Sequence, residues 1–154
     1  MAHEPDAQLT TLFPELRTWN GGDGVSVSTW LSTFGSIPQA IAYSTLFCPE
    51  FVEHEGCILS FGFEPQTSDD WIRSLGGDRT RAEMVINHVH ISSLFFPGEV
   101  YTSEQMDYLG RVLKKMWTLK LQHDFPLSGV QVEFLWNDRD DYDDAQLTVY
   151  CQRP

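Results

Sequence analysis

Basic residues are scarce in this sequence. Its 10 Lys and Arg residues stand against 22 Asp and Glu residues, so the formal net charge at pH 7 is -12. A chain with this charge repels nucleic-acid phosphates and anionic lipids. The sequence therefore argues against binding to nucleic acid or to a membrane, and it favours a protein partner with a basic surface.

Cysteines and long apolar runs are also few. Cys48, Cys57 and Cys151 are an odd number, are widely spaced and contain no C-x-x-C pair, which argues against the disulfide framework of a secreted domain. No apolar run approaches the about 18 residues of a membrane span, and the first residues lack the basic and apolar regions of a signal peptide. These absences predict a cytoplasmic protein with reduced thiols.

The remaining composition is that of an ordinary globular protein. The chain has 154 residues, of which 42% are hydrophobic and 13% aromatic. This is enough apolar material for a core without help from a disulfide or a structural metal. The absence of any internal repeat or shift in composition predicts a single globular domain over residues 1–154.

Apolar residues at helical spacing, together with capping residues, predict most of the regular structure. The predicted helices cover residues 5–13, 27–34, 36–47, 67–75, 78–96 and 102–125. The best boundary is that of the last helix, where Thr102 and Gln105 have the spacing of a capping box.

Alternating apolar residues predict two hairpins. Phe51–His54 pairs with Cys57–Phe63 around Glu55-Gly56, and Val130–Trp136 pairs with Ala145–Cys151. The expected fold is α+β, with an antiparallel sheet of about four strands built from the two hairpins and helices packed mainly on one face.

Residues 78–96 are the most apolar long segment and contain two of the five histidines. As a helix, this segment would bury Val85, Ile86 and Val89, although its β-branched residues leave a strand as the alternative. His88 and His90 would diverge by about 200° on a helix, but on a strand they would point to one face and could hold one metal ion. The helix favours a structural role for His88.

Two groups of side chains could support catalysis. Glu50, Glu53, His54 and Glu55 place carboxylates beside an imidazole, as general acid-base catalysis or metal binding requires. Alternatively, Cys48 or Cys57 could act as a nucleophile with His54 or His88 as its base. Both patterns are also typical of non-catalytic residues, namely a charged hairpin edge and core thiols.

Five aspartates fall within residues 137–144, between the predicted strands of the second hairpin. The segment has neither the central Gly nor the final Glu of an EF-hand loop, so it does not indicate specific calcium binding. We expect either a solvated turn or a partner-binding surface. The residues of that surface would be Asp138, Asp140, Asp141, Tyr142, Asp143 and Asp144.

Taken together, these patterns predict a cytoplasmic interaction module for a basic protein partner, such as an inhibitor or neutraliser of that partner. No cofactor is indicated, and the sequence favours a non-enzymatic role while leaving catalysis open. The alternative is a small enzyme or metal-binding protein that uses His88, His90, His54 and nearby carboxylates.

Overall fold

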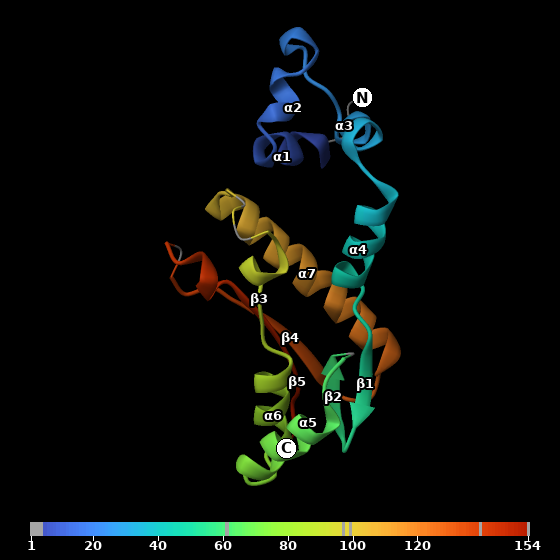
Figure 1. Ribbon diagram of the computed structural model, residues 1–154, viewed down its shortest axis with the longest axis vertical. Helices are drawn as coiled ribbons and strands as arrows, with labels where there is room; N and C mark the ends of the chain where they lie inside the picture. Colours follow the sequence, from blue (N-terminus) through green and yellow to red (C-terminus); the bar gives the residue numbers. More distant parts are fainter. Residues whose placement is uncertain (1–4, 61, 97, 99, 139, 154) are drawn as a thin grey trace. The chain divides into compact units, whose positions relative to one another are not determined.

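The computed structural model describes residues 5–60, 62–96, 98, 100–138 and 140–153, without the side chains of residues 5–8 and 142. It contains helices and antiparallel strands, which confirms the α+β class (Figure 1). The contacts divide the chain into two compact units, residues 1–43 and 44–154. The single domain expected over residues 1–154 stays a prediction. None of the described helices has both the length and the apolar composition needed to cross a lipid bilayer.

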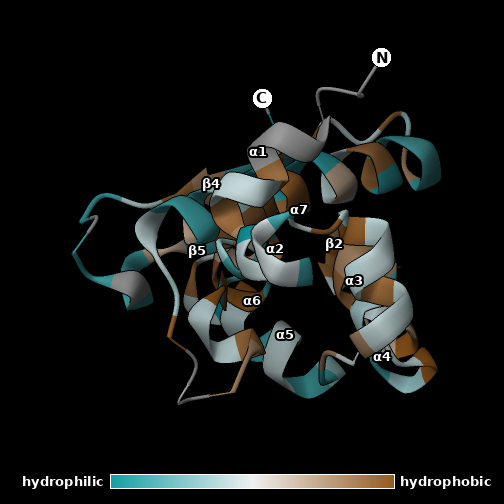
Figure 2. Ribbon diagram, turned by 90° about the horizontal axis from the view of Figure 1, so that it is seen from above, coloured by the Kyte–Doolittle hydropathy of each residue, from teal (hydrophilic) through white to brown (hydrophobic). Residues whose placement is uncertain are grey.

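The first unit is helical. Its elements are α1 (Pro5–Leu12), α2 (Glu15–Thr18), the 3-10 turn η1 (Asn20–Gly22), α3 (Val27–Phe34) and most of α4 (Ile37–Phe47). Leu12 and Leu16 are its buried hydrophobic side chains among those described, and the ring of Trp30 lies 5.6 Å from that of Phe34. Hydrophobic residues alternate with polar ones along α3 and α4 (Figure 2).

Capping residues start three helices where the sequence predicts, whereas the helix predicted to begin at residue 67 starts at Pro65 without a side-chain cap. The Ser26 hydroxyl accepts a hydrogen bond from the backbone of α3, and the Asp78 carboxylate does the same for α6 (Arg79–Ile86). At α7 (Ser103–Asp124), Thr102 and Gln105 form the reciprocal capping box, with N···O distances of 3.2 and 2.8 Å. These caps satisfy backbone N–H groups that have no partner within the helix.

The second unit contains every strand found among the described residues. Strands β1 (Phe51–His54) and β2 (Cys57–Ser60) form a two-stranded sheet, with Glu55 and Gly56 at φ values of 50° and 76° in the tight turn. Strands β3 (Val89–His90), β4 (Val130–Leu135) and β5 (Gln146–Cys151) form an antiparallel sheet in the order β3-β5-β4. Helix α5 (Pro65–Ser74) follows the first sheet, and the 3-10 turns η2 (Ser92–Leu94) and η3 (Tyr142–Asp144) precede α7 and β5.

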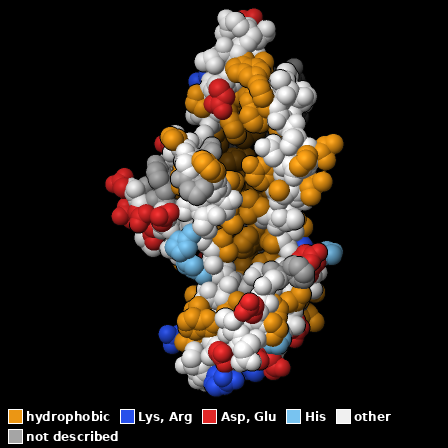
Figure 3. All heavy atoms as spheres, viewed as in Figure 1, with side chains coloured by type: hydrophobic (Ala, Val, Ile, Leu, Met, Phe, Trp, Pro, Cys, Tyr) orange, Lys and Arg blue, Asp and Glu red, His pale blue; other side chains and the backbone are white. Residues whose placement is uncertain are grey.

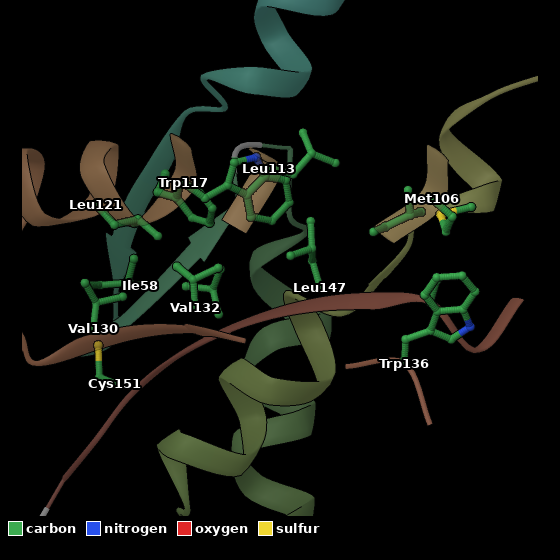
Figure 4. Close-up of a cluster of buried hydrophobic side chains, with 14 residues drawn as sticks. Ile58, Met106, Leu113, Trp117, Leu121, Val130, Val132, Trp136, Leu147 and Cys151 are labelled. Carbon is green, nitrogen blue, oxygen red and sulfur yellow. The ribbon is translucent and has the colours of Figure 1, made fainter. Parts of the chain in front are cut away.

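Helix α7 covers the core side of the larger sheet. Leu113, Trp117 and Leu121 project from α7 towards Val130 and Val132 of β4 (Figure 4). The helix comes close to the strand at Gly110, where an added Cβ would lie 2.3 Å from the Phe134 ring. Any side chain at this position would therefore require the Phe134 ring to move.

The predicted helix over residues 78–96 is wrong beyond Ile86. There α6 ends, and Val89 and His90 pair as β3 with Leu147 and Gln146 of β5. Val85 is 42% exposed, and Ile86 and Val89 are half-buried, so the expected burial of these three residues on one helix is also wrong. Tertiary hydrogen bonding overrides the helical pattern here, because strand pairing satisfies the backbone groups that a longer helix would have used.

The predicted four-stranded sheet is replaced by two smaller ones, because side chains of α6 and the residue after it lie between the hairpins. The Glu83 carboxylate accepts hydrogen bonds from the backbone N–H groups of Ile58 in β2 (2.8 Å) and Cys151 in β5 (2.7 Å). The Asn87 amide donates to the carbonyl oxygens of Ile58 (2.8 Å) and Val149 (3.0 Å). These hydrogen bonds use backbone N–H and C=O groups at the edges of β2 and β5, through which the two strands could otherwise have paired.

Helices also lie on both faces of the larger sheet, and not mainly on one. Val132 and Val149 face the core beneath α7. Thr148 alternates with them and so points to the opposite face, where its hydroxyl donates to the carbonyl oxygen of Met84 in α6 (3.0 Å). Residues 78–86 therefore pack against the face of the larger sheet opposite α7, whereas the sequence predicted helices mainly on one face.

Candidate functional site

The acidic turn, defined as residues 137–144, joins β4 to β5 and projects four exposed carboxylates. These belong to Asp138, Asp140, Asp141 and Asp143, whereas Asp144 is half-buried. Figure 3 shows acidic side chains gathered on one flank of the molecule with histidine side chains beside them. Arg139 lies outside the described part of the structure, as does the side chain of Tyr142.

Hydrogen bonds within the acidic turn fix its backbone. Backbone N–H groups of Asp138 and Asn137 donate to one Asp144 oxygen at 2.9 and 2.6 Å and hold the pKa of that carboxyl below its usual value. The carboxylate of Asp138 accepts from the backbone of Asp140, and that of Asp141 from Asp143, each at 3.0 Å. The turn is therefore ordered by its own aspartates, in the manner of Asx turns.

Below the turn, Trp136 is buried and anchors it. Its indole N–H donates to the carbonyl oxygen of Asp141 at 3.1 Å, and its side chain belongs to the hydrophobic core. The next core residue along the chain, Ala145, is fully buried. Both ends of the acidic turn are consequently attached to packed structure.

His88 and His90 meet next to the acidic turn. Their Nε2 atoms are 3.0 Å apart, and the planes of their rings lie at 76°. His90 Nδ1 is hydrogen-bonded to the carbonyl oxygen of Asp143, whose carboxylate accepts a bond from the Ser92 hydroxyl at 2.7 Å. Burial, and then the neighbouring His90, lower the pKa of His88 below its ordinary value. The predicted divergence of the two histidines is wrong, since they do not lie on a helix.

His54 does not join this pair. Its Nε2 lies 3.0 Å from a carboxylate oxygen of Asp69 in α5, and its ring packs 5.1 Å from the ring of Phe63. Within the described residues, no three His, Cys, Asp or Glu side chains gather as metal ligands. The alternative metal site built from His88, His90 and His54 together is therefore not assembled.

The buried thiols are poor nucleophiles. Burial, with Glu83 as the second cause, raises the pKa of Cys57, and the same two causes raise the pKa of Cys151 to about 11. The sulfur of Cys57 lies 4.0 Å from the carbonyl oxygen of Arg79 and is hydrogen-bonded to no imidazole. An activated thiol needs the opposite shift, towards the thiolate. Cys57 therefore has the surroundings of a core residue.

Thiol labelling of the native protein tests this arrangement. Cys48 is exposed, whereas Cys57 and Cys151 are 0% and 3% exposed. We expect an aromatic disulfide reagent at pH 8 to modify Cys48 rapidly and the other two only after unfolding, because the reagent must reach a thiolate. Absorbance of the released thiol, with Cys48→Ser as the control, measures this. Rapid labelling in the native Cys48→Ser protein would contradict the assignment.

The buried polar cluster around Glu83 was not predicted from the sequence. This side chain is 0% exposed and receives a bidentate contact from Arg153, with N···O distances of 2.7 and 2.9 Å. Arg153 also donates to the carbonyl oxygen of Gly56 at 2.6 Å. The only local signal is an acidic residue inside an apolar segment, which could equally have faced solvent.

The candidate residues therefore fall into three groups: the acidic turn with the histidine pair, His54 with Asp69, and the buried thiols near Glu83. Glu50, Glu53 and Glu55 are exposed around the β1–β2 hairpin. No protein-family model, no curated protein and no solved structure matches this chain.

Proposed function

We propose that this protein is a cytoplasmic interaction module that binds a basic protein partner through the acidic turn. The observation that carries the proposal is the row of exposed carboxylates on Asp138, Asp140, Asp141 and Asp143. Within the described residues, no lysine or arginine forms an ion pair with them. A cationic partner would relieve the repulsion between these like charges.

The order of the acidic turn supports the same proposal. Backbone groups of its described residues are held by aspartate side chains and by Trp136, so a partner would not have to order them on binding. The bonds accepted by the carboxylates of Asp138, Asp141 and Asp144 leave the negative charges of these groups in place. Charge that is both exposed and fixed in position speeds association and selects an oppositely charged partner. This suits an inhibitor or neutraliser of a basic protein.

A charge-removal variant tests the proposal. Asp138, Asp140, Asp141 and Asp143 are replaced together by Asn, which keeps side-chain size and an acceptor oxygen, while Asp144 is retained for its two backbone bonds. Binding of an oligolysine peptide is measured at low ionic strength. We expect at least about tenfold weaker binding, or about 1.4 kcal/mol. The difference should shrink as salt is raised, because salt screens exposed charges.

The matched control removes the same number of charges elsewhere. Glu50, Glu53, Glu55 and Glu64 are exposed, and their replacement by Gln changes the net charge equally. The control should bind the peptide nearly as the parent does. Equal weakening in both variants would mean that the peptide senses only net charge, and the acidic turn would then be a solvated loop.

A further inference from the structure

The paired histidines beside the acidic turn have a geometry that the proposed function does not use. Their Nε2 atoms face each other at 3.0 Å, although both residues are exposed and could have turned to solvent. In His90 the other ring nitrogen is held by the carbonyl oxygen of Asp143. Ring orientation of this kind, fixed from behind by a backbone carbonyl, is typical of histidines that bind metals.

The hydrogen bond to Asp143 determines where the proton of His90 lies. A carbonyl oxygen only accepts, so Nδ1 carries the proton and the lone pair of neutral His90 is on Nε2. In the metal-free pair, His88 Nε2–H donates to this lone pair. If that proton moves to Nδ1 of His88, both Nε2 atoms carry a lone pair, and no net proton is lost. We propose that His88 and His90 bind one divalent transition-metal cation through their Nε2 atoms, with Cu(II) as the preferred ion.

The separation of the two nitrogens allows neighbouring coordination of one ion, once small ring rotations direct both lone pairs to one point. With metal–nitrogen bonds of about 2.0–2.1 Å, a separation of 3.0 Å corresponds to an angle at the metal of about 90–100°. This is the angle between neighbouring ligands in square-planar or octahedral coordination, and it is smaller than the tetrahedral angle of structural zinc sites. Imidazole ligands in tetragonal geometry favour Cu(II), which also binds most strongly in the first-row series.

The surroundings favour a cation at this point. The acidic turn carries four exposed carboxylates and raises the local concentration of cations. Asp143 is held on both sides, through its carbonyl oxygen by His90 and through its carboxylate by Ser92. Because both imidazoles are exposed, water completes the coordination and the site stays open.

Cu(II) titration followed by calorimetry and electron paramagnetic resonance tests the proposal. The parent protein carries His3→Ala and Cys48→Ser, because His3 lies outside the described residues and the exposed Cys48 thiol could reduce Cu(II). We expect one equivalent of Cu(II) with nitrogen hyperfine structure in its spectrum. His88→Ala should weaken binding at least about tenfold, since even a group behind a ligand is worth about 10–100-fold.

His88→Ala is the decisive variant because it leaves the bond between His90 and Asp143 in place. His54→Ala and His123→Ala serve as matched controls and should bind as the parent does, because neither imidazole belongs to the pair. Parent-like affinity in His88→Ala would overturn the proposal, as would a spectrum with oxygen donors alone. Either result would leave the oligolysine test of the acidic turn unaffected, since that test changes no histidine.

Discussion

Replacement of Glu83 by Ala is expected to lower the free energy of unfolding by about 3–5 kcal/mol, because it removes one partner of a buried ion pair. Glu83 is 0% exposed and contacts Arg153 through both carboxylate oxygens. It also accepts hydrogen bonds from the backbone N–H groups of Ile58 and Cys151. The substitution therefore leaves two backbone N–H groups without their acceptor and the Arg153 guanidinium without its carboxylate partner.

Urea unfolding followed by tryptophan fluorescence measures the loss. Glu50→Ala removes an exposed carboxylate and should change stability by less than about 0.5 kcal/mol. A double-mutant cycle with Arg153→Ala isolates the ion pair, and the two losses should not add, because both residues act in one cluster. A loss below about 1 kcal/mol for Glu83→Ala would show that Glu83 does not hold β2 and β5 together.

The second large effect is expected at Trp117, where replacement by Ala should cost about 3–5 kcal/mol. Trp117 is 6% exposed, packs edge-on against the ring of Phe51 at a centroid distance of 5.9 Å, and donates its indole N–H to the carbonyl oxygen of Leu46 at 2.8 Å. The change removes an aromatic side chain from the centre of the core and leaves a carbonyl group without its donor.

Two further variants serve as comparisons in the same unfolding experiment. Trp117→Phe keeps an aromatic ring but loses the hydrogen bond, so it should cost less than Trp117→Ala. Met116→Ala alters the neighbouring, 39% exposed side chain of α7 and should have a much smaller effect. Equal losses at Trp117 and Met116 would contradict the assignment of the core face of α7.

Ile86 is only half-buried, so Ile86→Ala should also cost less than Trp117→Ala.

The acidic turn could be located from the sequence, because a run of aspartates between two alternating apolar segments is a local pattern. Its order could not be predicted. That order depends on which carboxylates accept which backbone N–H groups and on the bond from Trp136 to Asp141. It also depends on the bond between His90 and Asp143, which the pairing of β3 with β5 brings together. The meeting of His88 and His90 depends on the same pairing.

By itself, the sequence determined the elements that local interactions stabilise. The start of the helix at residue 27, the capping box of Thr102 and Gln105, and the turn at Glu55-Gly56 are all confirmed, since each depends on atoms only a few residues apart. The tertiary structure decided where α6 ends and how the strands are divided between two sheets. Glu83 and Asn87 reach backbone groups 25 to 68 residues away. Hydrophobic periodicity contains no information on such contacts, because a buried polar side chain is stabilised by partners that only the folded chain brings to it.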